Sequence, residues 1–287
     1  MKRLSDGPGR DESNLTMMPR AQKGRILIAA GSDSGGGAGI QADLKAVTAL
    51  GGYGMTAITA LTAQNTEGVF GIHDVPPDFI RQQLELVLGD IGADCVKTGM
   101  LHSVAVIDAV CDVLEAMAPD TPVVVDPVMV AKGGHALLEN SAIGVLKARM
   151  ILRATVLTPN IPEAELLTGM SIRDIDGMRH AAEMLLSLGA QAVLLKGGHM
   201  SGDVLTDLLA TEHGIETFES PRLHTRHTHG TGCTLASAIA CGIAQGLGLS
   251  DAVRRARTYV TTAIRTAPGF GRGHGPLNHS HTVSQDA

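Results

Sequence analysis

Aromatic residues are scarce in this 287-residue sequence, which has no tryptophan, two tyrosines and four phenylalanines. The core must therefore be aliphatic, and the stacking of successive bases on aromatic side chains, common in single-strand binders, is disfavoured. Positive charge is also in short supply: 23 Lys and Arg residues against 29 Asp and Glu residues give a formal net charge of −6. Without a basic face we expect no nucleic-acid partner, although a small phosphate ligand needs only a local positive site.

Long apolar runs and paired cysteines are missing too. No apolar run reaches the roughly 18 residues of a membrane span, so we expect no membrane association. None of the four cysteines belongs to a C-x-x-C pair, and their spacing predicts no disulfide framework. Reduced thiols are typical of the cytoplasm, which is the location we expect. The cysteines are Cys95, Cys111, Cys233 and Cys241.

The two ends of the chain differ from its middle. Residues 1–24 are polar and lack the apolar segment of a secretory signal, so they are predicted to form a disordered extension. Residues 25–278 are predicted to form a single α/β domain, because α/β chains of this length need not divide. Residues 279–287 are expected to be a flexible tail with solvated histidines.

Short apolar runs alternate with longer amphipathic segments between these ends. This alternation predicts βαβ units and a mostly parallel sheet with helices on both faces, a three-layer α/β fold. The predicted strands cover residues 25–32, 55–64, 95–100, 122–129, 155–160 and 192–198, with a hairpin at 204–219. The predicted helices cover residues 40–50, 77–90, 103–117, 141–151, 231–248 and 250–267, with two more between 160 and 189.

Ligands of such sheets bind beyond the carboxyl ends of the strands, so residues directly after the apolar runs are candidates for the site. The first candidate is the glycine-rich turn GSDSGGGAGIQADL, residues 31–44. It fails the dinucleotide fingerprint, because Ile40 takes the third glycine position, and it is no G-x-x-x-x-G-K-[ST] loop. A tight turn and a close approach of the backbone to a ligand both stay open, with Asp43 one helical turn further on.

An amide pair and a buried acid follow the next strands. Gln64 and Asn65 come after the strand at 55–64, and a side-chain amide suits a heteroaromatic edge with a ring nitrogen and an amino group. Surface amides after strands are also common. Asp126 lies near the end of an apolar strand, where an acid is costly unless it is paired or binds a cation; a turn-forming carboxylate is the plainer alternative.

Asn160 and Glu163 have the spacing of a helix capping box, with Pro162 in the first turn. Their oxygens would equally suit a hydrated Mg²⁺ that bridges to nucleotide phosphates. Lys196 ends a strand, either as an ordinary turn exit or as a contact to a nucleotide.

The stretch Gly230–Cys233 (GTGC) begins a helix made of small residues. Its glycines let backbone N–H groups point into one concavity, and the helix dipole adds positive potential, which predicts an anion hole. A cysteine at a helix N-terminus has a favoured thiolate, so Cys233 could take a proton from a substrate alcohol; a small residue that merely starts the helix is the alternative. His224, His227 and His229 lie just upstream, but no acid or cysteine set completes a metal site with them.

Taken together, these residues resemble the ribokinase-like superfamily, and within it the hydroxymethylpyrimidine/phosphomethylpyrimidine kinases of thiamine biosynthesis. The resemblance covers about residues 25–278. The motifs GSDSGGGAGIQADLKA, ITALTAQNT, KTGML, DPVMVAKGG, TPNIPEAELL, KGGH and THGTGCT occur in the order found in that family. The resemblance implies a ribokinase-like fold, ATP and Mg²⁺ as co-substrate and cofactor, phosphorylation of the pyrimidine's hydroxymethyl group and then of the monophosphate, and a homodimer.

The resemblance also implies roles for individual residues. Cys233 would be the base, and Gly230, Thr231 and Gly232 would complete the anion hole for the transferring phosphoryl group. Further residues would bind the pyrimidine: Gln64 at its edge, with Asp43, Thr62, Met100 and Gly31 around it. The expected contacts to ATP are Asn160, Lys196, Thr228 and Arg272, and the expected metal-organising residues are Asp126 and Glu163.

Three other functions compete with this one. A pyridoxal or pyridoxine kinase, closely related in fold, is the alternative enzyme. A ligand-binding relative without activity is disfavoured because Cys233, Asp126 and Glu163 are intact. A nicotinamide oxidoreductase is disfavoured because the glycine fingerprint fails.

Overall fold

Five consecutive apolar residues, Ile26–Ala30, place the first strand in the centre of the molecule. The computed structural model describes residues 23–131 and 134–283, and all five side chains are at most 1% exposed there. Leu27 and Ala29 pack into one hydrophobic cluster, whereas Ile26, Ile28 and Ala30 pack into a second. Because successive side chains of a strand point to opposite faces, this strand requires a core on each face of its sheet.

The sheet has nine strands within the described residues, in the order β3-β2-β1-β4-β5-β6-β7-β8-β9. The six strands from β2 to β7 in this order pair in parallel, and β3, β8 and β9 add to the two edges in antiparallel orientation. The predicted, mostly parallel sheet is confirmed. The strands are β1 (Arg25–Asp33), β2 (Tyr53–Gln64), β3 (Val69–Asp74), β4 (Cys95–Thr98), β5 (Val123–Val125), β6 (Val156–Leu157), β7 (Ala192–Leu195), β8 (Val204–Thr211) and β9 (Gly214–Pro221).

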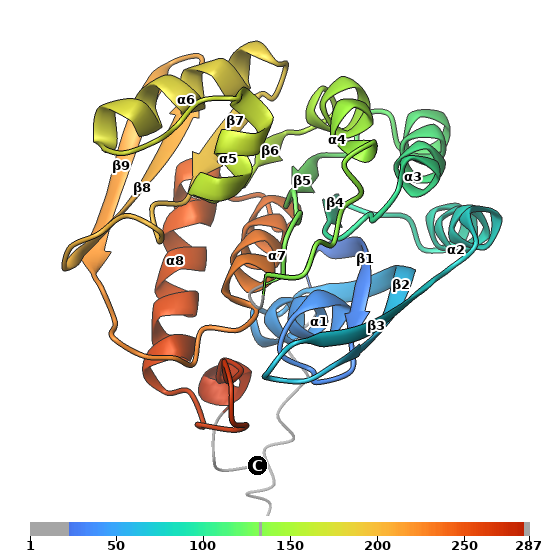
Figure 1. Ribbon diagram of the computed structural model, residues 1–287. Helices are drawn as coiled ribbons and strands as arrows, with labels where there is room; N and C mark the ends of the chain where they lie inside the picture. Colours follow the sequence, from blue (N-terminus) through green and yellow to red (C-terminus); the bar gives the residue numbers. More distant parts are fainter. Residues whose placement is uncertain (1–22, 132–133, 284–287) are drawn as a thin grey trace, which may run out of the picture.

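Helices cover both faces of the sheet, as Figure 1 shows. One face carries α1 (Gly39–Ala49), α7 (Thr231–Ala244) and α8 (Leu249–Arg265). The other carries α2 (Pro77–Asp90), α3 (Val104–Met117), α4 (Ala142–Val145) with its π-helical continuation Leu146–Ile151, α5 (Ile161–Thr168) and α6 (Ile175–Ser187). The three layers agree with the sequence-based expectation. No helix in the described part of the chain is long and apolar enough to cross a membrane.

The antiparallel edge strand β3 was not predicted from the sequence. Its pattern, VFGIHD, has a glycine in the middle, and only Val69 is buried. A half-exposed strand at a sheet edge gives little hydrophobic signal, because one face and one hydrogen-bonding side meet solvent.

The boundaries of the domain differ slightly from prediction. Lys23 and Gly24, assigned to the disordered extension, join the domain: the Lys23 N–H donates to Gly51 O at 3.0 Å. At the other end, His279–Thr282 form a 3₁₀ helix on Tyr259, whose hydroxyl lies 3.0 Å from His279 Nδ1. The tail was expected to be flexible and His279 solvated; burial against Tyr259 overrides that pattern. Residues 1–22 and 284–287 lie outside the described residues.

Helix α2 provides a matched test of this packing. Leu84 is fully buried in the core beneath the helix, and Leu86, two residues later, is 66% exposed. We predict that Leu84→Ala lowers the free energy of unfolding by about 2–5 kcal/mol, because it removes buried methyl groups and leaves a cavity. Leu86→Ala should change it by less than about 0.5 kcal/mol. Urea unfolding of both variants measures the difference; equal effects would show that α2 does not pack as described.

Candidate functional site

Most predicted site residues follow strands at the same edge of the sheet. The parallel strands β1, β4, β5, β6 and β7 all end at this edge, and so does the long strand β2 that pairs with β1. The N-terminus of α7 lies close to it, because a Cβ added to Gly232 would be 3.3 Å from Lys196 Nζ, directly after β7. The structure therefore brings together side chains that are up to 200 residues apart in sequence.

The residue directly before α7, Gly230, has to be a glycine. Gly230 has φ = 79°, and an added Cβ would lie 1.7 Å from Gly37 O in the glycine-rich turn after β1. Thr231 Oγ1 donates to Thr228 O at 2.7 Å, which fixes the turn from inside. No side chain among the described residues caps this 14-residue helix. Thr231 N donates to Thr228 O at 3.4 Å, so the N–H groups of Gly232 and Cys233 are the ones available to a ligand. This geometry agrees with the predicted anion hole.

Two carboxylates and a lysine lie beside that helix start. Lys196 Nζ is 3.1 Å from Asp126 Oδ1, and Thr158 Oγ1 is 3.2 Å from the same oxygen. A Cβ on Gly232 would be 3.7 Å from Asp126 Oδ2. Burial lowers the pKa of Lys196, but the charges of Asp126 and Glu163 outweigh it and raise that pKa above its ordinary value, so the ammonium stays charged.

Glu163 completes the predicted capping box of α5. Its Oε2 accepts from Asn160 N at 2.8 Å, and Asn160 Oδ1 accepts from Glu163 N at 2.9 Å. The box is thus confirmed, and it explains why Glu163 is present locally. It does not account for the burial of its carboxyl, which is 6% exposed. Burial and the charge of Asp126 raise the pKa of Glu163 to about 7 despite the opposing charge of Lys196.

A second buried ion pair lies beneath the anion hole. Lys97 Nζ contacts both carboxylate oxygens of Asp43 at 2.9 and 3.0 Å, and neither side chain is exposed at all. Ser237 Oγ donates to Asp43 Oδ1 at 2.7 Å. Burial lowers the pKa of Lys97, but the charges of Asp43, Cys233 and Asp126 and the hydrogen bond to Asp43 together outweigh it and raise that pKa. Asp43 was predicted to line the substrate pocket; in the structure its carboxylate is instead enclosed by Lys97 and Ser237.

Cys233 is partly exposed at the start of α7, but its thiol is not activated in the way the sequence indicated. Burial of the thiol raises its pKa to about 12, and the nearby charges of Asp43 and Asp126 add to this. Lys97 acts in the opposite direction without compensating fully. The expectation of a favoured thiolate was therefore wrong for the ligand-free protein: desolvation exceeds the effect of the helix N-terminus.

Asp33 and His229 were not identified as a pair from the sequence. Asp33 Oδ2 lies 2.8 Å from His229 Nε2, with the two side chains 3% and 12% exposed. The pair ties the glycine-rich turn after β1 to the anion-hole turn. The only sequence signal was an acid inside the turn and a histidine next to Gly230, 196 residues away. His229 was weighed only as a metal ligand; among the described residues, no group of three His, Cys, Asp or Glu side chains could hold a metal ion.

Two of the predicted pyrimidine contacts, Gln64 and Thr62, lie on the His229 side of this pair. Gln64 Nε2 lies 3.3 Å from His229 Nε2, and Gln64 Oε1 lies 3.2 Å from Thr62 Oγ1. Met100 approaches Gly31, where an added Cβ would be 3.2 Å from the methionine sulfur. Gln64 and Thr62 thus lie together beside His229, and Met100 lies beside Gly31.

Arg272 lies further out. Its guanidinium is 2.9 Å from Glu67 Oε2 in the turn between β2 and β3, and its side chain is 85% exposed. The predicted contact of Arg272 to a nucleotide stays a prediction, as does that of Thr228.

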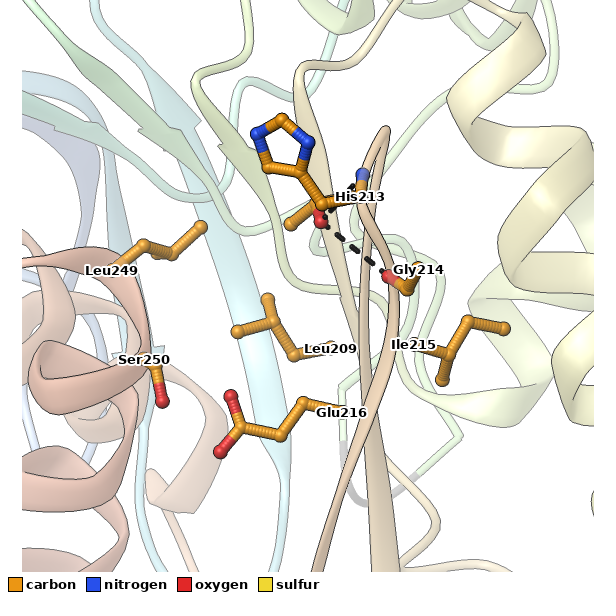
Figure 2. A pocket seen from close by; sticks show the side chains of 8 residues that line it. Leu209, His213, Gly214, Ile215, Glu216, Leu249 and Ser250 are labelled. Carbon is orange, nitrogen blue, oxygen red and sulfur yellow. Dashed lines mark hydrogen bonds between the residues drawn. The ribbon is translucent and has the colours of Figure 1, made fainter.

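A pocket of about 350 Å³ lies elsewhere, between the β8–β9 hairpin and the start of α8. Figure 2 shows Leu209, His213, Glu216 and Leu249 around it. Because Thr211, another lining residue, pairs with Ala192 at the start of β7, the pocket lies at the opposite end of the strands from the residues described above. It contains none of the predicted site residues, and we do not assign the activity to it.

Comparison with known protein families gives a consistent picture. A family model described as phosphomethylpyrimidine kinase matches residues 33–278. A hydroxymethylpyrimidine/phosphomethylpyrimidine kinase of Streptomyces coelicolor is 48% identical over 260 residues, which cover 91% of this chain and 96% of the relative. The thiamine biosynthesis bifunctional protein ThiED of Geobacter sulfurreducens is 56% identical over 257 residues and 90% of this chain, but the chain spans only 52% of that longer protein.

Solved structures include two kinds of similar kinase. A pyridoxal kinase of Bacillus subtilis in complex with ADP has a TM-score of 0.84 and 36% identity, covering 90% of this chain and 98% of that one. A phosphomethylpyrimidine kinase of Clostridium difficile has a TM-score of 0.75 and 42% identity, covering 84% of this chain and 100% of that one. The ribokinase-like fold expected from the sequence is confirmed.

The raised pKa of Cys233 leads to a direct test in the ligand-free protein. Below its pKa, a thiol gains about tenfold in thiolate fraction for each pH unit. We therefore predict that the rate of Cys233 alkylation by iodoacetamide rises about tenfold per unit from pH 7 to pH 10 without a plateau. Peptide mass mapping follows Cys233 separately, with the fully buried Cys95 as an internal control. A plateau near pH 8 would contradict the burial of this thiol.

Proposed function

The chain belongs to the phosphomethylpyrimidine kinase family, and from this membership and its site we propose that it is an ATP-dependent kinase of thiamine biosynthesis. The substrate is 4-amino-5-hydroxymethyl-2-methylpyrimidine, which is phosphorylated on its alcohol, and the resulting monophosphate is then phosphorylated again to the pyrophosphate. One observation carries the proposal: the uncapped start of α7 lies between a carboxylate–lysine group and an amide suited to a pyrimidine edge.

The uncapped helix start holds the phosphoryl group in this proposal. The N–H groups of Gly232 and Cys233 provide donors for its oxygens, and the charge of Lys196 lies on the same side of the helix start. Phosphoryl transfer passes through a loose transition state, in which positioning and charge stabilisation contribute most of the catalysis. A fixed array of donors at a helix N-terminus meets that requirement.

The carboxylates of Asp126 and Glu163 fit a Mg²⁺ ion. Both are nearly buried, at 2% and 6% exposure, and burial together with the charge of Asp126 raises the pKa of Glu163 despite the nearby Lys196. Oxygen ligands of this kind, together with water and phosphate oxygens, are what Mg²⁺ prefers. When bound, Mg²⁺ would neutralise charge on the phosphates of ATP. Asn160 and Lys196 are proposed to contact the nucleotide beside it, with Thr228 and Arg272 near the same ligand.

Cys233 is the proposed base for the substrate alcohol. In the free protein it is a thiol, so proton acceptance depends on a minor thiolate population that the charge of Lys97 favours. The transition state itself needs little help from a base when it is loose. Whether Cys233 contributes as a base or as a positioned neighbour of the phosphoryl group is therefore decided by its replacement.

A pyridoxal kinase is the second candidate, supported by the fold similarity to the Bacillus subtilis enzyme. Gln64 favours the pyrimidine, because its amide can meet an amino group and a ring nitrogen at once. Pyridoxal offers a phenolic oxygen and an aldehyde in place of that pair.

We also propose that the protein works as a homodimer in the cytoplasm. The homodimer rests on the family resemblance alone. The cytoplasmic location is supported by four free cysteines, as expected for a reducing compartment.

Replacement of the thiol tests the base role. We predict that Cys233→Ala lowers kcat by about 10²-fold or more, the usual scale for loss of a general base, whereas the KM for ATP changes far less. Steady-state kinetics with the pyrimidine alcohol measure both constants. Near-normal turnover would exclude the base role and leave only the anion hole.

Replacement of the amide tests the substrate. An unpaired buried polar group costs about 1–3 kcal/mol, which corresponds to about 5- to 150-fold in kcat/KM. We therefore predict that the wild-type protein prefers the pyrimidine alcohol to pyridoxal by such a factor, and that Gln64→Leu narrows the gap by losing mainly pyrimidine activity. The measurement is kcat/KM for both alcohols in both proteins. Better wild-type activity on pyridoxal, or an equal loss on both, would favour the second candidate.

A further inference from the structure

The contacts of the Gln64 amide present a conflict of donors and acceptors. Gln64 Nε2, which can only donate, lies 3.3 Å from His229 Nε2, and Gln64 Oε1, which can only accept, lies 3.2 Å from Thr62 Oγ1. Each contact forms a hydrogen bond only if the opposite atom has the complementary role. The other contacts of His229 and Thr62 decide whether it has.

Asp33 determines the role of His229 Nε2. The carboxylate already accepts from the N–H groups of Gly35 at 2.8 Å, Gly37 at 3.0 Å and Ala38 at 2.8 Å. Burial opposes ionisation, but the hydrogen bond from His229 and these N–H groups outweigh it and lower the pKa of Asp33. An ionised carboxylate only accepts, so His229 Nε2 at 2.8 Å carries a hydrogen in either charge state of the ring.

Ser32 determines the role of the Thr62 hydroxyl in the same way. Thr62 Oγ1 lies 2.8 Å from Ser32 O, a backbone carbonyl that only accepts. The single hydroxyl hydrogen is used there, so Thr62 can only accept from Gln64. Thr62 therefore requires the amide nitrogen, and the His229 Nε2–H favours the amide oxygen over the amide nitrogen. Each neighbour now faces the other atom of the amide.

We propose that the Asp33–His229 pair and Thr62 hold the Gln64 amide turned by 180°, and that this orientation sets the substrate specificity of the site. Oε1 then shares the His229 Nε2–H with Asp33 Oδ2 in a three-centre hydrogen bond, and Nε2 donates to Thr62 Oγ1. One oxygen lone pair, on the side of His229, and one N–H, on the side of Thr62, remain for a ligand.

This orientation dictates how a pyrimidine binds, if the proposed function holds. The amino group donates to Gln64 Oε1 on the side of His229, and the adjacent ring nitrogen accepts from Gln64 Nε2 on the side of Thr62. The deaminated analogue, 5-hydroxymethyl-2-methylpyrimidin-4(3H)-one, has a carbonyl oxygen beside a ring N–H and needs the reverse. Asp33, His229 and Thr62 are thus positioning residues that act through Gln64.

The selectivity between the amino and oxo pyrimidines tests this proposal. The wild-type protein should prefer the amino compound by on the order of 10²-fold or more in kcat/KM, because the analogue leaves two polar contacts unpaired. His229→Leu removes the fixed donor, so the ratio should fall about tenfold or more, mainly through KM for the amino compound. His229→Gln, which retains an N–H donor, should keep the ratio within about threefold of the wild-type value.

A double-mutant cycle separates this role from a structural one. In the Gln64→Leu background, His229→Leu should leave the ratio unchanged, because its effect passes through the amide. Thr62→Val should also lower the ratio of kcat/KM for the amino compound to kcat/KM for the oxo analogue. It serves as the second variant if His229→Leu does not fold. A wild-type ratio in both folded variants would overturn the proposal.

A measurement without substrate distinguishes failure of this inference from failure of the proposed function. Long-range ¹H–¹⁵N spectra of the ligand-free protein should show His229 with a hydrogen on Nε2. A neutral ring with its hydrogen on Nδ1 alone would overturn the fixed amide even in an active kinase. Absence of turnover with the pyrimidine, combined with a hydrogen on Nε2, would contradict the proposed function and not the arrangement around Gln64.

Discussion

Lys97 carries a positive charge into a fully buried position, and the elements around the site are arranged to neutralise it. Its ammonium meets Asp43 from α1, and Asp43 in turn accepts from Ser237 of α7. One network thus joins β4, α1 and α7. Met100 follows β4, the glycine-rich turn leads into α1, and Cys233 lies at the start of α7. A buried charge with one partner removed costs about 3–5 kcal/mol, so the three elements cannot shift apart independently. This constraint also fixes the position of the start of α7, which lies one helical turn before Ser237.

The site concentrates positive potential in a protein with a net charge of −6. Lys97 lies below the anion hole, Lys196 lies beside it, and the uncapped end of α7 adds its dipole. Asp126 and Glu163 partly cancel the charge of Lys196, and Asp43 pairs with Lys97. In the proposed function, the phosphates of the nucleotide and Mg²⁺ would meet charges that are already in place.

Local patterns in the sequence predicted much of this arrangement, and long-range contacts account for what they missed. The capping box of Asn160 and Glu163 was predictable because its partners are three residues apart. The enclosure of Asp43 and the Asp33–His229 pair join residues 54 and 196 apart, and no periodicity shows which distant side chain an acid will meet. The Cys233 thiol was misjudged for a related reason: its helix position is local, but the burial that raises its pKa comes from the packed domain.

The central claim is that one site transfers a phosphoryl group first to an alcohol and then to the phosphate so formed. ³¹P NMR of the wild-type protein with 4-amino-5-hydroxymethyl-2-methylpyrimidine, excess ATP and Mg²⁺ tests it most directly. We predict a phosphomonoester resonance that appears first and is then replaced by the coupled pair of resonances of a diphosphate ester. A product that stays at the monophosphate while ATP remains, or no phosphorylation of the pyrimidine at all, would contradict the claim.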